Sequence, residues 1–229
     1  MEALAITEKY ELDVKPISIQ GKTLELYGLS NWDSFVANLE EKGESYIQAF
    51  PFWIKIWEAS IILADHMLTL DLDKEKHVLE IGAGMGLTGL FLGAFGHQVT
   101  ITDCEEEALQ LLRLNVAHNN LSHVQVKKLD WNEPDLVGRY DIICGSELVY
   151  KETFIEPLIE LFRKYLKPAG TVFIAHDIRR MCMMKFIATV PGRFEIENVG
   201  KTLRGEDDIF RILVHTLHLK ESTQPSKEK

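Results

Sequence analysis

Apolar and polar residues alternate near the start of the chain, and this pattern predicts a β-hairpin over residues 10–29. Leu12 and Val14 occupy alternate positions, and the alternation resumes at Leu24 after a turn that contains Gly21. A period of two around a glycine-containing turn is typical of two antiparallel strands.

The next two segments have a different pattern. Residues 31–48 are mostly polar and charged, and they predict a short helix followed by a loop. Residues 50–70 are apolar on most sides of a helical projection, with Pro51 near the expected first turn. Such a helix is usually buried against other elements.

From residue 77 onward, short apolar runs alternate with longer segments of helical character. The five predicted strands cover residues 77–81, 98–102, 124–126, 140–144 and 171–175. The predicted helices cover residues 87–95, 105–119, 153–166 and 181–190. Two further strands, residues 194–199 and 210–217, are separated by a charged loop and predict a terminal hairpin. The sequence therefore predicts an α/β fold whose sheet is mostly parallel with one antiparallel strand.

Composition and charge narrow the class of protein. The chain has 229 residues, of which 46% are hydrophobic and 26% charged, as expected for a globular domain. Its net charge of −10 argues against a broad basic surface for nucleic acid. No apolar run is long enough to span a membrane, and the N-terminus lacks the features of a secretory signal. The three cysteines are sparse and outside metal-binding motifs, so we expect a cytoplasmic protein without a metal site.

A glycine-rich loop follows the first predicted strand of this β-α-β pattern. Gly82, Ala83, Gly84 and Gly86 lie between that strand and a helix. Glycines let ligand atoms approach the backbone closely, and the helix N-terminus presents unpaired N–H groups. The loop predicts a site for a nucleotide-like ligand.

Acidic and aromatic residues end the next two strands. Asp103 can accept hydrogen bonds from a ribose diol. Asp130 can accept a hydrogen bond from an adenine amino group, and Trp131 can stack on the adenine ring. Glu80, just before the glycines, can hold a cationic group or order the loop. The alternative for Asp103 and Asp130 is that they only cap the helices that follow.

These residues together resemble the class I S-adenosylmethionine-dependent methyltransferases, in particular methyltransferase family 16, whose characterised members are largely protein-lysine methyltransferases. The segments that match the family include Trp57 and residues 78–89, 102–103, 114–119, 129–131 and 146–150. One residue departs from the family pattern: the motif after the fourth strand usually begins with Asp, whereas this chain has Glu147 followed by Tyr150. Glu keeps the charge and lengthens the side chain by one methylene.

The resemblance implies a Rossmann-like, doubly wound sheet of seven strands, with the reversed last strand inserted between the fifth and the sixth. It also implies S-adenosylmethionine as the methyl donor, with contacts from Trp57 and Ser146 in addition to the glycine loop, Asp103 and Trp131. We expect residues 1–70 to form a hairpin and helical extension on the donor-binding core, residues 71–219, followed by a frayed tail over residues 220–229.

The acceptor end of the expected site carries Glu147 and Tyr150. If a helical turn begins there, their spacing of three places both on one face. Our hypothesis is that Glu147 holds an incoming lysine ammonium and that Tyr150, with Trp57, forms an aromatic wall. Methylation requires a neutral amine, and the proton can leave to water.

Other functions remain open at this point. A small-molecule or different amino-acid side chain can be the methyl acceptor in place of a protein lysine. A nicotinamide-dependent oxidoreductase can have the same fold, but this chain has GxGxG instead of GxGxxG and lacks a Tyr-x-x-x-Lys pair. A donor-binding module without catalytic activity is the remaining alternative. The sequence leaves the oligomeric state undetermined.

Overall fold

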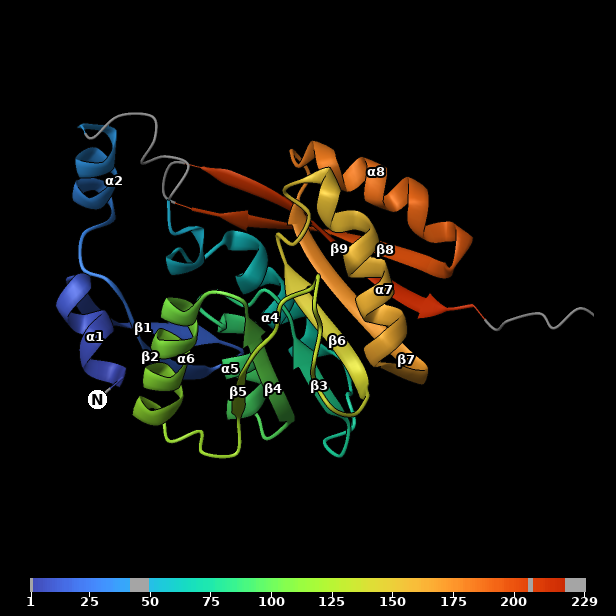
Figure 1. Ribbon diagram of the computed structural model, residues 1–229, viewed down its shortest axis with the longest axis horizontal. Coiled ribbons are helices and arrows are strands. Elements are labelled where there is room, and N and C mark those ends of the chain that lie inside the picture. Colours follow the sequence, from blue (N-terminus) through green and yellow to red (C-terminus); the bar gives the residue numbers. More distant parts are fainter. Residues whose placement is uncertain (1, 42–49, 206–207, 221–229) are drawn as a thin grey trace, which may run out of the picture.

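The computed structural model describes residues 2–41, 50–205 and 208–220, and its largest element is a seven-stranded sheet (Figure 1). The strands are β3 (His77–Glu80), β4 (Gln98–Asp103), β5 (Gln125–Lys128), β6 (Tyr140–Ser146), β7 (Leu166–Asp177), β8 (Phe194–Arg204) and β9 (Ile209–Leu219). Their order across the sheet is β5-β4-β3-β6-β7-β9-β8. β9 runs in the opposite direction to the other six strands, so the predicted α/β sheet with its reversed last strand is confirmed.

Helices cover both faces of this sheet. They are α4 (Glu58–Thr69), α5 (Leu87–Ala94), α6 (Glu106–His118), α7 (Ile155–Tyr165) and α8 (Met181–Thr189), with short 3₁₀ turns η2 (Glu152–Phe154) and η3 (Val190–Gly192). Alternate residues of a strand belong to two separate hydrophobic cores, one on each face of the sheet. Val78 packs with α4, α5 and α6, whereas Leu79 packs with α7 and α8. Burial on both faces explains why these strands are continuous apolar runs in the sequence.

The N-terminal elements lie at one side of the sheet, where α1 and β2 contact α6 (Figure 1). They are α1 (Glu2–Lys9), β1 (Leu12–Ile19), β2 (Lys22–Leu29), α2 (Trp32–Glu41) and η1 (Phe52–Ile54). The predicted hairpin is confirmed, and its two turn residues, Gln20 and Gly21, both have positive φ, 49° and 76°. The helix expected after residue 31 is also present, whereas α1 was not predicted.

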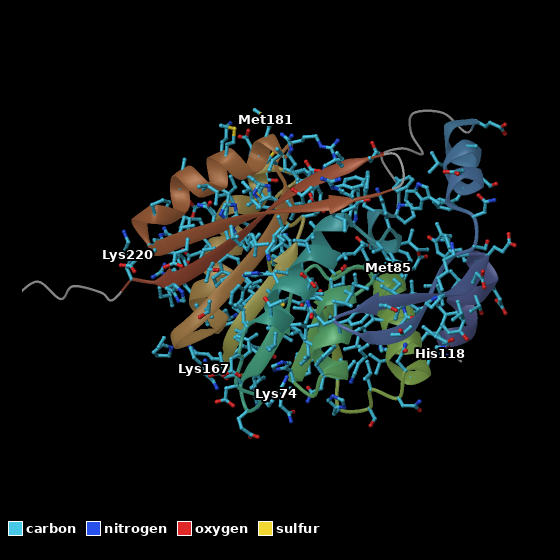
Figure 2. The ribbon with its side chains drawn as sticks, turned by 180° about the vertical axis from the view of Figure 1, so that it is seen from behind. Lys74, Met85, His118, Lys167, Met181 and Lys220 are labelled. Atoms are coloured by element: carbon cyan, nitrogen blue, oxygen red, sulfur yellow. The ribbon has the colours of Figure 1, made fainter. Side chains whose placement is uncertain are left out.

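A third apolar cluster joins these elements to the sheet. It includes Ile6 and Tyr10 from the N-terminal segment, Met85 from the glycine loop and Leu111 from α6. Figure 2 shows Met85 where the hairpin meets the central helices. The glycine loop therefore packs against N-terminal elements that lie far from it in the sequence.

The long helix predicted over residues 50–70 is wrong in its first part. Residues 52–54 form η1, the backbone is extended at Lys55 and Trp57, and α4 begins only at Glu58. Trp57 therefore precedes α4 instead of lying within it. In this extended conformation Trp57 donates its indole N–H to the Phe52 carbonyl, 3.1 Å away, and lines a cavity.

Two expectations fall partly outside the described residues. The loop expected at the end of the 31–48 segment covers residues 42–48, and the frayed tail covers residues 221–229. Within the described ranges, no helix is both long enough and apolar enough to cross a lipid bilayer.

Candidate functional site

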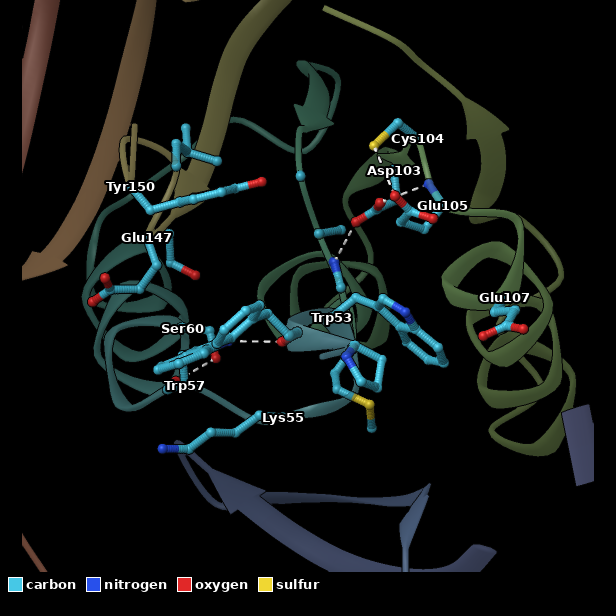
Figure 3. Close-up of a pocket in the computed structure, with 18 of the residues that line it drawn as sticks. Trp53, Lys55, Trp57, Ser60, Asp103, Cys104, Glu105, Glu107, Glu147 and Tyr150 are labelled. Carbon is cyan, nitrogen blue, oxygen red and sulfur yellow. Dashed lines mark hydrogen bonds between the residues drawn. The ribbon is translucent and has the colours of Figure 1, made fainter. Parts of the chain in front are cut away.

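A cavity of about 710 Å³ lies at the carboxyl ends of the parallel strands. Its walls come from the glycine loop, the ends of β4 and β6, the segment after β5, and residues 50–60. In Figure 3, Asp103, Cys104 and Glu105 lie on one side of the cavity, and Glu147, Tyr150 and Trp57 lie on the other. This edge of an open α/β sheet is the usual place for a ligand.

The glycine loop forms the floor of the cavity at Gly82, Ala83 and Gly84. Gly84 has φ +53°, and a Cβ there would lie 2.8 Å from the Trp53 carbonyl oxygen. Gly82 has φ +55°, and a Cβ there would lie 2.9 Å from the Trp131 ring. Both positions thus require glycine, and the loop leaves backbone exposed where side chains would otherwise fill the space. Gly86 does not line the cavity; it precedes α5 as its N-cap.

Asp103 connects the glycine loop to the start of α6. Its carboxylate accepts the Gly84 N–H at 2.8 Å and the Glu105 N–H at 3.0 Å. Burial raises the pKa of Asp103, against the effect of these hydrogen bonds. Asp103 therefore supports the helix start and also lines the cavity, and each carboxylate oxygen keeps a lone pair for a ligand hydroxyl.

Asp130 and Trp131 lie in the loop after β5, and both line the cavity. Asp130 is exposed and accepts hydrogen bonds from the backbone and side chain of Asn132. No helix separates β5 from β6, so the alternative role of Asp130 as a helix cap is wrong. The Trp131 ring lies over Gly82 and packs edge-on against Phe154, which leaves an aromatic surface in the cavity wall.

Glu80 lies behind the glycine loop and not in the cavity wall. Its side chain is 2% exposed and accepts the Gly89 N–H of α5 at 2.9 Å. Burial raises the pKa of Glu80 to about 8. Of the two roles considered for this residue, its contacts support ordering of the loop and helix, because its carboxyl group does not reach the cavity.

Glu147 lies at the opposite end of the cavity from Asp103 (Figure 3). One carboxylate oxygen accepts the Asp177 N–H at 2.8 Å, and the other accepts the Arg180 Nε–H at 2.5 Å. The expected helical turn at residues 147–150 is wrong: Glu147 has φ +54°, and helical backbone begins at Glu152. Glu147 and Tyr150 nevertheless both line the cavity, because the chain turns away from the end of β6 at these residues.

Aromatic side chains surround this second end. Tyr150 is 57% exposed and packs edge-on against Phe154, with ring centres 4.9 Å apart. Partial burial, followed by the nearby Cys104 and Asp103, raises the pKa of its hydroxyl and keeps it protonated. Trp57 and Ser146, which the family resemblance implied as donor contacts, also line the cavity.

Several lining residues were missed by sequence reasoning. Arg180 lines the cavity, whereas the side chain of the neighbouring Arg179 is 74% exposed and paired with Asp177. The sequence gives no means to distinguish these two arginines. Trp53 and Lys55 line the cavity as well, although their pattern predicted a buried helix. Lys9 lines it from α1, which reaches the site only through tertiary packing.

Comparison with known sequences identifies a family. The family described as "Lysine methyltransferase" matches residues 48–192. Zebrafish (Danio rerio) protein N-lysine methyltransferase METTL21A is 32% identical over 165 residues, which cover 68% of this chain and 75% of that protein. Mouse (Mus musculus) EEF1A lysine methyltransferase 3 is 33% identical over 131 residues, which cover 55% of this chain and 56% of that protein.

Comparison with solved structures identifies the fold. The N-methyltransferase NodS from Bradyrhizobium japonicum WM9, in complex with S-adenosyl-L-homocysteine, superposes with a TM-score of 0.57 at 19% identity, covering 69% of this chain and 86% of NodS. Precorrin-6y C5,15-methyltransferase from Geobacter metallireducens GS-15 gives a TM-score of 0.58 at 13% identity, covering 74% of this chain and 91% of the other. These likenesses show a shared Rossmann-like methyltransferase fold.

Proposed function

This chain belongs to the lysine methyltransferase family, and from that premise we propose how its cavity binds a methyl donor and a lysine acceptor. The protein is an S-adenosylmethionine-dependent methyltransferase that acts on lysine in proteins, in keeping with relatives at about 30% identity. The observation that carries the proposal is one cavity with an acidic and glycine-rich end and an acid-aromatic end.

The first end fits the donor. The uncovered backbone of Gly82–Gly84 leaves room for it, Asp103 keeps lone pairs for the ribose hydroxyls, and Trp131 offers a ring for the adenine. Asp130 is exposed beside Trp131 and can accept a hydrogen bond from the adenine amino group. Trp57 and Ser146 would complete these contacts at the other side. When bound, S-adenosylmethionine supplies a methyl group activated by its positive sulfonium.

The second end would receive the lysine. Glu147 attracts the ammonium and fixes the direction of the side chain, while Tyr150 and Trp57 enclose its apolar part and its charge. The amine must be neutral when it reacts, because an ammonium has no lone pair. With Glu147 already an acceptor of two hydrogen bonds, we propose that the proton leaves to water.

The other functions considered have less support. An oxidoreductase or a scaffold without activity is not favoured by any contact in the cavity, and the family assignment points to methyl transfer. A small-molecule acceptor remains the second candidate, because the cavity is open at Tyr150, which is 57% exposed.

The organisation and location of the chain are also proposals. We propose residues 71–219 as the donor-binding core and residues 1–70 as an extension packed on it, with α4 contributing directly to the sheet's core. We further propose a cytoplasmic location, because Cys104, Cys144 and Cys182 are all free thiols.

Two variants test the catalytic assignment. Glu147→Gln and Tyr150→Ala should each reduce transfer of a radiolabelled methyl group into a cell lysate by about 100-fold or more, because the first removes the charge that attracts the ammonium and the second removes the ring that aligns the side chain. Their affinity for S-adenosylhomocysteine, measured by calorimetry, should remain near that of the wild-type protein. Protease treatment of the labelled lysate separates protein from small-molecule acceptors.

The matched controls are Glu152→Gln, which removes an exposed acid from the next turn, and Met184→Ala, which truncates an exposed apolar side chain outside the cavity. Both should keep wild-type turnover. Unchanged turnover in both Glu147→Gln and Tyr150→Ala would contradict the assignment, and protease-resistant label would favour the small-molecule acceptor.

A further inference from the structure

The place proposed for the acceptor ammonium already contains a cation of the protein. The guanidinium of Arg180 donates from Nε to Glu147 at 2.5 Å, and its central carbon lies 5.2 Å from the centre of the Trp57 ring. A carboxylate and an aromatic face around one cation are the contacts expected for a bound lysine ammonium. Arg180 therefore makes, from within the chain, the contacts that the acceptor would make.

The other cationic side chains of the cavity form their ion pairs with acids other than Glu147. Lys55 also lies over the Trp57 ring, 4.5 Å from its centre, but it pairs with Glu58 at 3.8 Å. Lys9 of α1 pairs with Glu107 of α6. Among the described residues that line the cavity, Arg180 is the cation that forms an ion pair with Glu147.

Glu147 is fixed, whereas Arg180 can move. The Glu147 backbone N–H donates to the Ala175 carbonyl at 2.9 Å, and its carboxylate accepts the Asp177 N–H, so two backbone contacts with β7 hold it. Its side chain is only 10% exposed. The Arg180 side chain is 37% exposed and extends from the N-cap of α8, so it can rotate into solvent without moving a helix or strand.

We propose that Arg180 determines acceptor specificity by occupying the ammonium place in the free enzyme, so that a lysine enters only by displacing it. This inference rests on the proposed function, because Glu147 defines the place. In the free protein, Arg180 compensates a mostly buried carboxylate that would otherwise lack a countercharge. A small amine must compete with a tethered guanidinium, whereas a lysine on a protein surface brings additional contacts that offset the displacement.

The experiment measures binding of a lysine side-chain mimic, n-butylammonium, to the protein saturated with S-adenosylhomocysteine. Affinity is followed by tryptophan fluorescence at constant ionic strength and checked by calorimetry. In Arg180→Met the dissociation constant should fall by about tenfold or more, as expected when an occupant present about nine-tenths of the time is removed. The matched control, Arg179→Met, removes the adjacent and exposed arginine and should leave it unchanged.

A double variant locates the effect. If the gain arises at the carboxylate that Arg180 releases, it should be lost in Glu147→Gln combined with Arg180→Met. Arg180→Gln, which keeps a hydrogen-bond donor without the charge, provides a second comparison if the methionine variant does not fold, and it should also bind the probe more tightly than the wild-type protein.

Equal affinity in the wild-type protein and the folded Arg180 variants would overturn the proposal. An equal gain in Arg179→Met would also overturn it, because the effect would then be one of general charge. Failure of the proposed function is distinguishable: it appears as full methyl transfer by Glu147→Gln, which is a measurement of turnover and independent of probe binding to the Arg180 variants.

Discussion

Glu80 is an acidic residue whose side chain is buried in the folded protein. Its carboxyl group accepts the Gly89 N–H, but burial is the largest influence and raises its pKa from 4.5 to about 8. The folded protein therefore binds a proton that the unfolded chain releases above about pH 4.5. This contribution to stability is complete below that pH and is lost as the pH rises to about 8.

Glu80→Gln tests this sign. Glutamine keeps an acceptor for Gly89 but cannot ionise, so the variant should gain stability relative to the wild-type protein as the pH rises. The difference should change by about 1 kcal/mol per pH unit between about pH 5.5 and about pH 7.5. Urea unfolding without donor, at matched pH values, measures it.

The control for this prediction is Glu75→Gln, which changes an exposed acid in the loop before β3. Its difference from the wild-type protein should stay nearly constant over the same range. A Glu80→Gln difference that is also constant would show that Glu80 ionises normally despite its burial.

Single residues also show where sequence reasoning stopped. Asp103 and Glu147 could be identified because they directly follow or end strands and belong to recognisable motifs. Their partners could not, since Arg179 and Arg180 are adjacent and chemically identical. Only the local backbone decides that Arg180 faces the cavity and Arg179 faces Asp177.

At the scale of elements, the segment before α4 and the glycine loop fit each other closely. The Trp53 carbonyl lies where a Cβ of residue 84 would be, at 2.8 Å. The segment is extended after η1 and not helical, and this conformation places Trp53 and Trp57 along the cavity. Helical periodicity alone could not reveal it, because aromatic residues that line a cavity and residues of a buried helix are equally apolar.

Gly84→Ala should therefore displace this segment. The substitution combines the strain of a positive φ with a collision against Trp53, so we expect a loss of stability above about 2 kcal/mol and at least about tenfold weaker S-adenosylhomocysteine binding. Gly21→Ala is the matched control, because Gly21 also has positive φ but nothing lies within 4 Å of its would-be Cβ. It should lose about 1 kcal/mol and keep donor affinity. Similar donor affinities for the two variants, by calorimetry, would contradict the close fit.

The hairpin docks on α6 through two asparagines one helical turn apart. Asn115 is fully buried and accepts the Tyr27 N–H at 2.7 Å, whereas the half-buried Asn119 accepts the Glu25 N–H at 3.0 Å. These amides satisfy backbone groups at the edge of β2 that have no strand partner. Their spacing places both side chains on one face of the helix.

Asn115→Ala should lower the free energy of unfolding by about 1 to 3 kcal/mol, because it leaves a buried N–H without an acceptor. Asn119→Ala makes the same chemical change where water can replace the amide, and its effect should be smaller. Urea unfolding of the two variants decides the point; equal losses would mean that burial is not the cause.

At the scale of the whole molecule, the cavity exists only because distant parts of the chain meet at one edge of the sheet. The crossovers that give the order β5-β4-β3-β6-β7-β9-β8 bring Asp103, Trp131 and Glu147 to the carboxyl ends of neighbouring strands. The N-terminal segment closes one side through Lys9 and Tyr10. A ligand in this cavity would therefore contact the N-terminal segment as well as the carboxyl ends of the strands.

Donor product should stabilise the entire fold for this reason. With S-adenosylhomocysteine at about 100 times its dissociation constant, linkage gives about 2.7 kcal/mol, which corresponds to a rise in Tm of roughly 5 to 10 °C for a domain of this size. Differential scanning fluorimetry measures the rise. NAD is the control ligand and should produce none; a rise with NAD and none with S-adenosylhomocysteine would contradict the donor assignment.

The sequence by itself determined the alternation of strands and helices, the glycine loop and the acids at the strand ends, because each depends on local backbone preference or on burial of both sheet faces. Tertiary structure decided the extended backbone at Trp57, the position of Glu80 behind the loop and the pairing of Glu147 with Arg180. These features depend on contacts between residues far apart in the chain, whose energies outweigh local propensity. No pattern within one segment carries that information.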